Sequence, residues 1–84
     1  MDNRKFMQVA VKAVVDYFNT HHNMKITDDD VFIVWMCKTI ANNKAMLSTT
    51  VSDGMYYEFT WNGAKNEGYL DAYKKWENVV VTAD

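Results

Sequence analysis

The residues able to do chemistry in this sequence are few, and they form no recognised catalytic pattern. Cys37 is the single cysteine, and a cysteine becomes a nucleophile where a neighbouring histidine or cation favours its thiolate. Nothing in the sequence forces such a group beside it, so we expect Cys37 to be a buried small apolar residue. His21 and His22 are adjacent, and adjacent helical side chains diverge by about 100°, too far to converge on one metal ion. We expect them to stabilise a helix C-terminus.

Three consecutive aspartates, residues 28–30, suggest a metal site at first reading. A calcium-binding loop that began at Asp28 would have glycine at its sixth position and glutamate at its twelfth. The sequence has Ile33 and Thr39 there, so we interpret the run as a solvated acidic turn or helix start.

The other polar residues fit ordinary structural roles. The hydroxyls of residues 48–50 have no histidine or lysine beside them in a recognised arrangement, and Gly63 and Gly68 are outside any phosphate-binding loop pattern. Glu58 and Asp71 are expected to face each other across two strands, with no pocket around them. We therefore expect no catalytic, cofactor-binding or metal-binding residue, and a protein that is not an enzyme.

Length and charge limit the remaining classes. A chain of 84 residues is one domain, and 49% hydrophobic with 14% aromatic residues is typical of a folded one. The net charge of −2 excludes a strongly basic nucleic-acid binder and is too small for an acidic DNA mimic. No signal-peptide pattern is visible, and the longest apolar run, residues 31–37, is far shorter than the ~20 residues of a membrane span. We expect a soluble protein of a reducing cytoplasm.

The elements that must position these residues begin with a helix over about 3–22. Apolar residues recur there at spacings of three and four, which is one face of a helix: Phe6, Ala10, Ala13, Val14, Tyr17 and Phe18. Asp2 or Asn3 can cap its start, and Asn23 can end it.

The next segment allows two interpretations. Residues 31–40 start with β-branched and aromatic residues, which predicts a strand. Thr27 followed three residues later by Asp30 is typical of a capping box, so a helix over 28–41 is the alternative. Residues 41–44 are expected to form a turn, and residues 45–51 the second strand.

A third strand is predicted over 55–61, with Tyr57, Phe59 and Trp61 on one face and Tyr56 on the other. Asn62-Gly63 is a strong hairpin signal, and we expect a positive φ at Gly63. Residues 67–76 suit either a helix or a fourth strand. The hairpin signal favours the strand, with Leu70 and Ala72 inward. Residues 79–81 are three valines, which we expect to pack.

These elements predict an α+β fold, a single domain over 1–84 with an N-terminal helix packed on a four-stranded antiparallel β-meander. One helix cannot cover both faces of such a sheet. The second face must therefore be polar, aromatic and functional, or covered by another protomer.

Aromatic residues interleaved with lysines are unusually dense in the second half of the chain. Such a surface suits a protein partner, through aromatic anchors, or single-stranded nucleic acid, through base stacking. In the alternative without function, the rings only cap the sheet edges and expose their polar tips. The candidate interaction surface comprises Trp35, Tyr56, Tyr57, Trp61, Tyr69, Tyr73, Lys74, Lys75 and Trp76. A homodimer built on a sheet face or edge is also expected, because so small a core is marginal.

From residue 30 onward the sequence resembles a family of small proteins of unknown function encoded by phages and prophages of Gram-positive bacteria. The resemblance is carried by Asp30-Val31-Phe32, Val34-Trp35, Cys37-Lys38-Thr39, Lys44-Ala45, Leu47-Ser48-Thr49, Tyr57-Glu58, Thr60, Asn62-Gly63, Lys65, Glu67, Tyr69, Asp71 and Tyr73-Lys74-Lys75. It implies a phage gene expressed in a bacterial cytoplasm, and it assigns no site residue. Together with the surplus of aromatic residues and the absence of catalytic patterns, it favours a non-enzymatic accessory protein that binds a host or phage protein.

Overall fold

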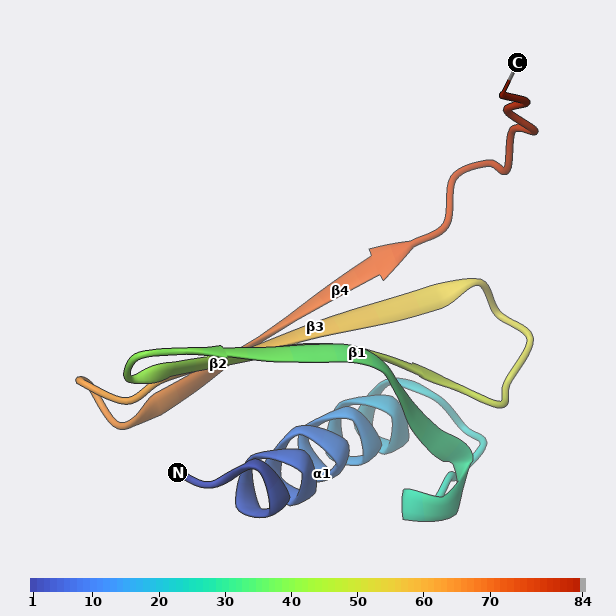
Figure 1. The fold of residues 1–84 in the computed structure, drawn as a ribbon. Coiled ribbons are helices and arrows are strands. Elements are labelled where there is room, and N and C mark those ends of the chain that lie inside the picture. The colour runs from blue at the N-terminus through green and yellow to red at the C-terminus, as the bar shows by residue number, and fades with distance from the viewer. Residues whose placement is uncertain (84) are drawn as a thin grey trace.

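The computed structural model describes residues 1–83 and has one helix beneath a four-stranded sheet (Figure 1). The elements, in chain order, are α1 (Asn3–His21), the short 3-10 helix η1 (Asp28–Asp30), β1 (Val31–Thr39), β2 (Asn42–Thr49), β3 (Met55–Asn62) and β4 (Glu67–Lys74). All neighbouring strands are antiparallel, and the order in the sheet is β1-β2-β3-β4. The predicted α+β meander with an N-terminal helix is confirmed.

Helix α1 forms where the apolar spacing predicts it, and its apolar face is buried completely. Phe6, Ala10, Val14 and Phe18 are all 0% exposed. The side chain of Asp2 accepts a hydrogen bond from the Lys5 amide at 2.8 Å, which satisfies one free amide of the first turn. The helix ends at His21, one residue before the predicted end.

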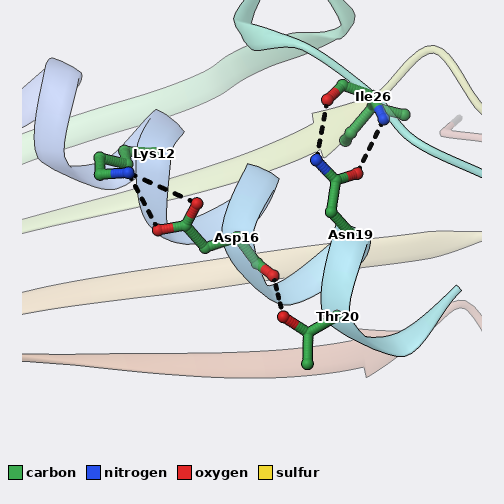
Figure 2. A network of polar contacts seen from close by, with 5 residues as sticks. All are labelled: Lys12, Asp16, Asn19, Thr20 and Ile26. Atoms are coloured by element: carbon green, nitrogen blue, oxygen red, sulfur yellow. Dashed lines mark hydrogen bonds and ion pairs between the residues drawn. The ribbon is translucent and has the colours of Figure 1, made fainter.

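A side-chain clamp fixes the chain after α1 (Figure 2). The Asn19 amide nitrogen donates to the Ile26 carbonyl at 3.0 Å, and the Asn19 amide oxygen accepts from the Ile26 amide at 2.8 Å. Ile26 itself is buried, so both of its backbone polar groups are satisfied by this one side chain. The clamp sets where the chain turns back toward η1 and β1.

The capping-box residues do start a helix, but a very short one. The Thr27 amide donates to Asp30 Oδ2 at 2.9 Å, as the box requires. After Asp30 the chain becomes β1, so the alternative helix over 28–41 is wrong. The β-branched residues that follow favour extended backbone over another helical turn.

The sheet has two unlike faces. We call the side against α1 the helix face; its central positions are Ala45 and Leu47 on β2 and Tyr57 and Phe59 on β3, all buried. The predicted alternation along β3 is therefore confirmed, with Tyr57 and Phe59 inward. On β4, Leu70 pairs with Phe59 and Ala72 with Tyr57, so both lie on the helix face as expected.

A bulge in β1 interrupts the alternation of its side chains. Ile33 pairs with Leu47, but the next pair is Trp35 with Met46, so Val34 has no partner on β2. Because one residue is inserted, Ile33 and Met36 both lie on the helix face while Trp35 turns to the opposite face.

The second strand begins earlier than predicted. Asn42, Asn43 and Lys44 belong to β2, and the turn is Ile40-Ala41, with Ile40 fully exposed at φ 48°. Asparagines are common in turns, but here Asn43 is buried on the helix face. The strand then ends at Thr49 instead of 51, since residues 50–54 form the connection to β3.

The predicted positive φ at Gly63 is wrong. Glu67 pairs with Asn62, which leaves residues 63–66 as the loop, and the positive φ is at Asn66. The Asn62 side chain accepts from the Ala64 and Lys65 amides at 3.1 and 3.2 Å and shapes this turn. Gly63 is required for another reason: a Cβ there would collide with the Ala41 carbonyl oxygen of the neighbouring turn.

Residues 67–74 are a strand, which resolves the helix-or-strand alternative for 67–76. The chain beyond Lys75 has no regular structure and leads away from the sheet (Figure 1). Residues 79–81 are exposed, so the expectation that these valines pack is wrong for this chain by itself.

Candidate functional site

The sheet face opposite α1 is uncovered, and no other element of residues 1–83 lies over it (Figure 1). We call it the open face. Strand register and the β1 bulge place these residues on it: Phe32, Trp35 and Cys37 from β1; Lys44, Met46 and Ser48 from β2; Tyr56, Glu58 and Thr60 from β3; Glu67, Tyr69, Asp71 and Tyr73 from β4.

Aromatic rings lie at both lateral edges of the open face. Trp35 on β1 and Tyr73 on β4 are 42% and 51% exposed, and Phe32 and Tyr69 are exposed beside them. Tyr56 pairs directly with Tyr73 and is half-buried. Since the largest side chains of this face are open to solvent, they contribute little to the core of the single chain.

A shallow hollow occupies one end of the open face, where β4 leads into the C-terminal residues. It has a volume of about 320 Å³ and is lined by Met46, Tyr56, Tyr73, Lys74 and Lys75. The lining combines apolar side chains with two lysines. It could take an apolar or aromatic side chain with an acidic neighbour.

Charged groups of both signs lie on the open face. Lys44 Nζ lies 3.4 Å from Glu58 Oε1, and Glu58 stands opposite Asp71 in the register, as the sequence predicts. The lysine offsets the like-charge contact between the two carboxylates. With Glu67 added, three carboxylates lie on the face, and they are matched by Lys44 and by the two lysines of the hollow, Lys74 and Lys75.

The structure separates the sequence-predicted interaction residues into two groups. Trp35, Tyr56, Tyr69 and Tyr73 do come together on the open face. Tyr57 is fully buried under α1, and Trp61 lies on the helix face, half-buried, next to the position of Gly68. Lys74 and Lys75 line the hollow, while Trp76 lies beyond it in the C-terminal residues.

Phe32, Met46 and Cys37 also belong to the open face, and sequence reasoning did not assign them to it. The signal for Met46 was its place between the inward residues Ala45 and Leu47. The bulge at Val34 hid the others, since nothing in residues 31–37 marks where the alternation changes.

Cys37 is exposed, so the prediction of a buried residue is wrong. The same bulge explains this, because it turns Cys37 to the open face, opposite Lys44 on β2. The thiol is accessible near the C-terminal end of β1, so it can be labelled to probe this surface.

The histidines act at the helix end, as predicted. His21 Nδ1 lies 2.8 Å from the Tyr17 carbonyl oxygen and His22 Nδ1 lies 3.1 Å from that of Phe18. Their rings stack on Tyr17 and Phe18, with centroids 4.1 and 4.0 Å apart. The two imidazoles therefore contact different carbonyls near the end of α1 and stack on different rings.

Hydroxyls of residues 48–50 hold the β2–β3 connection. Ser48 Oγ donates to the Met55 carbonyl at 2.9 Å, and Thr49 Oγ1 accepts from the Val51 amide at 3.1 Å. Thr50 donates from its backbone amide to the Asp30 carbonyl at 2.8 Å, which ties the acidic turn to this loop. Within residues 1–83 no group of three or more His, Cys, Asp or Glu side chains is arranged to hold a metal ion.

Tyr57 has a buried hydroxyl without a hydrogen-bond partner in the described chain. Burial raises the pKa of this phenol above its ordinary value, and the charge of Asp53 and the nearby Tyr17 add to the effect. On the open face, the Glu67 carboxylate raises the pKa of Tyr69 through a hydrogen bond. Both phenols therefore stay neutral at physiological pH.

The model of a family of unknown function, DUF6275, matches residues 7–83 of the chain. The chain belongs to this family. The DUF6275 match includes all four strands and nearly all of α1, so the two-faced sheet described above lies within the family's region. No curated protein and no solved structure matches the chain. Of the helices in residues 1–83, none combines the length and the apolar character needed to cross a bilayer.

Proposed function

We propose that this protein is a non-enzymatic binding module that recognises another protein through the open face of its sheet. The observation that carries the proposal is the set of exposed rings, Phe32, Trp35, Tyr69 and Tyr73, on a face with no covering element. Aromatic side chains in such positions are the usual anchors of protein interfaces.

Charge favours protein over nucleic acid as the partner. Binding single-stranded nucleic acid through stacked rings also needs basic groups that follow the phosphates. Here three carboxylates, Glu58, Glu67 and Asp71, lie among the rings, and Lys44 is paired with Glu58. The two remaining lysines, Lys74 and Lys75, lie together at one end of the face, so no line of basic groups follows the rings. The face therefore suits a protein partner that presents apolar side chains, with a basic group toward the carboxylates and an acidic group toward the two lysines of the hollow.

The setting we propose is a phage or prophage accessory protein acting in the cytoplasm of a Gram-positive host. The support is the resemblance of the sequence from residue 30 onward to small proteins of that origin. The partner is then a host or phage protein of the same compartment.

The test uses Cys37 as a photo-crosslinker site, because it is exposed on the open face. The labelled protein is exposed to light in an extract of a Gram-positive host, and the crosslinked protein is identified by mass spectrometry and purified. The affinity of the purified partner is then measured for the wild type, for Trp35→Ser and for the matched control Met24→Ser. The control changes an exposed residue outside the sheet. We expect Trp35→Ser to bind at least about 10-fold more weakly than the wild type, and Met24→Ser to bind as tightly as the wild type.

Equal affinities of the wild type and Trp35→Ser would contradict the proposal. A fluorescent single-stranded oligonucleotide, titrated at low and high salt, tests the alternative. Tight binding whose affinity falls by several powers of ten with salt would favour nucleic acid as the ligand.

A further inference from the structure

The C-terminal segment, residues 76–83, exposes apolar side chains that the single chain does not bury. Trp76 is 94% exposed, and Val80 and Val81 are 84% and 88% exposed, with Val79 beside them. The preceding residue is fixed, because the Lys75 amide donates to the Gly54 carbonyl at 2.8 Å. Three consecutive valines followed by threonine favour extended backbone, so the segment has the composition of a strand without a sheet to join.

The outer edge of β1 offers a matching position. β1 is the last strand on its side of the sheet, so its outward backbone groups have no strand partner. On the helix face an open groove of about 400 Å³ runs along this edge, lined by Met7, Gln8, Val11, Asp28, Val31 and Ile33. Two exposed apolar residues flank the same edge: Phe32, on the open face, and Val34, in the bulge.

A strand added at this edge would place alternate side chains on the two faces of the sheet. Val79 and Val81, two residues apart, would then enter the groove beside Val11 and Ile33. Val80 would point to the opposite side, toward Phe32 and Val34. The alternation of the segment thus fits the apolar residues on both sides of the edge.

The other edge of the sheet is protected in the usual way. β4 carries Glu67, Asp71 and Lys74 along its length, and charges on an edge strand oppose pairing with another strand. β1 has no charged residue from Val31 to Cys37. The edge that accepts an apolar strand is therefore β1.

The segment of the same chain cannot reach this position. It leaves from β4, at the opposite side of the sheet, and strands about 4.8 Å apart put the site outside β1 about 19 Å away. Residues 76–83 span at most about 28 Å when fully extended. Crossing the sheet would use most of that length and leave fewer than about three residues to pair.

We propose that residues 76–83 of one copy add a strand to the outer edge of β1 in a second copy, and that the exchange is reciprocal. Two copies that each donate this segment form a closed two-fold pair, which buries the valines of both. Because the contact lies at the β1 edge and the groove on the helix face, it covers only Phe32 among the exposed rings of the open face. It leaves Trp35, Tyr69 and Tyr73 free for a different partner.

Sedimentation of the full chain over micromolar to millimolar concentrations tests the proposal. We expect a reversible dimer, and at least about 100-fold weaker dimerisation for the double variant Val79→Asp/Val81→Asp. The matched control is Tyr69→Asp/Tyr73→Asp, which introduces the same charges on the open face and should leave dimerisation unchanged. All four residues are exposed in the single chain, so neither variant should disturb its fold.

Hydrogen exchange identifies the edge that is used. Amides of β1 should become protected as the wild type dimerises, and those of β4 should not change. A wild type that stays monomeric at all concentrations overturns the proposal. It is equally overturned by a dimer that survives the valine substitutions, by one that the tyrosine substitutions dissociate, or by protection at β4 instead of β1.

Discussion

At the scale of single residues, Tyr57 combines a structural role with an unmet polar group. Its ring is fully buried between α1 and the sheet, with the Tyr17 ring edge-on at 5.9 Å, while its hydroxyl has no partner in the described chain. The ring stabilises the core, and the hydroxyl costs part of that gain because a buried donor without an acceptor has lost its hydration.

Removing that hydroxyl should stabilise the protein. Tyr57→Phe keeps the ring and is expected to raise the free energy of unfolding by about 1 kcal/mol at neutral pH. Urea melts of both proteins measure the difference. A loss of stability would show that the hydroxyl has a partner, for example a bound water.

The same variant should also differ at alkaline pH. Because folding raises the pKa of Tyr57, its neutral form is favoured in the folded state, and stability falls as pH rises through and above about 10, where the unfolded tyrosine ionises first. The pKa of Tyr69 is also raised, but Tyr69 is present in both proteins, so it does not contribute to the difference between them. Melts between pH 8 and 11 should therefore show a shallower decline for Tyr57→Phe than for the wild type.

At the scale of elements, α1 is held by one line of buried side chains. Phe18 is its last member and lies fully buried in the final turn, where the His22 ring stacks on it. A core phenylalanine replaced by alanine loses its transfer energy and leaves a cavity.

Phe18→Ala should therefore cost about 3–5 kcal/mol, which approaches the whole stability of a domain of this size. Met24→Ala, at an exposed position, is the control and should cost less than about 0.5 kcal/mol. Denaturant melts decide, and similar midpoints for the two variants would show that α1 is not anchored through this face.

Two turn glycines are required for different reasons, and alanine separates them. Gly54 has φ 73° with open space around it, so Gly54→Ala should cost about 1 kcal/mol through backbone strain alone. At Gly63 the strain is absent, but an added methyl would meet the Ala41 carbonyl, which also accepts the Gly63 amide at 3.1 Å.

Gly63→Ala should therefore separate two neighbouring turns and destabilise the protein by about 2 kcal/mol, more than Gly54→Ala. Thermal melts of the two variants give the comparison. The reverse order would mean that the β1–β2 turn moves aside at little cost.

The elements differ in how far their sequence determines them. The helix and β3 are predictable because each has a clear period, 3.6 for Phe6 to Phe18 and 2 for Tyr57 to Trp61. The β1–β2 turn is not, because its positive φ falls on Ile40, a β-branched residue that rarely adopts it, while the turn-forming Asn43 is buried.

The candidate site was predictable only in part, again for a local reason. Tyr56, Tyr69 and Tyr73 follow from the alternation of β3 and β4. The β1 residues depend on a bulge at Val34 that composition does not reveal, so Phe32 and Cys37 could not be assigned to a face.

At the scale of the whole molecule, one helix covers one face, and the exposed rings on the other contribute little to folding. Replacing Trp35 and Tyr73 together by serine should change the free energy of unfolding by less than about 1 kcal/mol. By contrast, a single change of the same kind in the core, Phe59→Ser, should unfold the protein. Urea melts measure both. A large loss from the open-face pair would mean that these rings are structural, which would remove the basis for a binding role.

The meander has a kinetic consequence. The contacts of α1 with β1, β2 and β3 span longer stretches of chain, but each strand pairs with the one next to it, so the pairings of the sheet close short loops. Chains with such local connectivity reach the native topology quickly, and this one contains no proline whose isomerisation would delay a fraction of the molecules. Refolding from denaturant should thus be a single rapid event for the whole population, with assembly of copies as the only slower step.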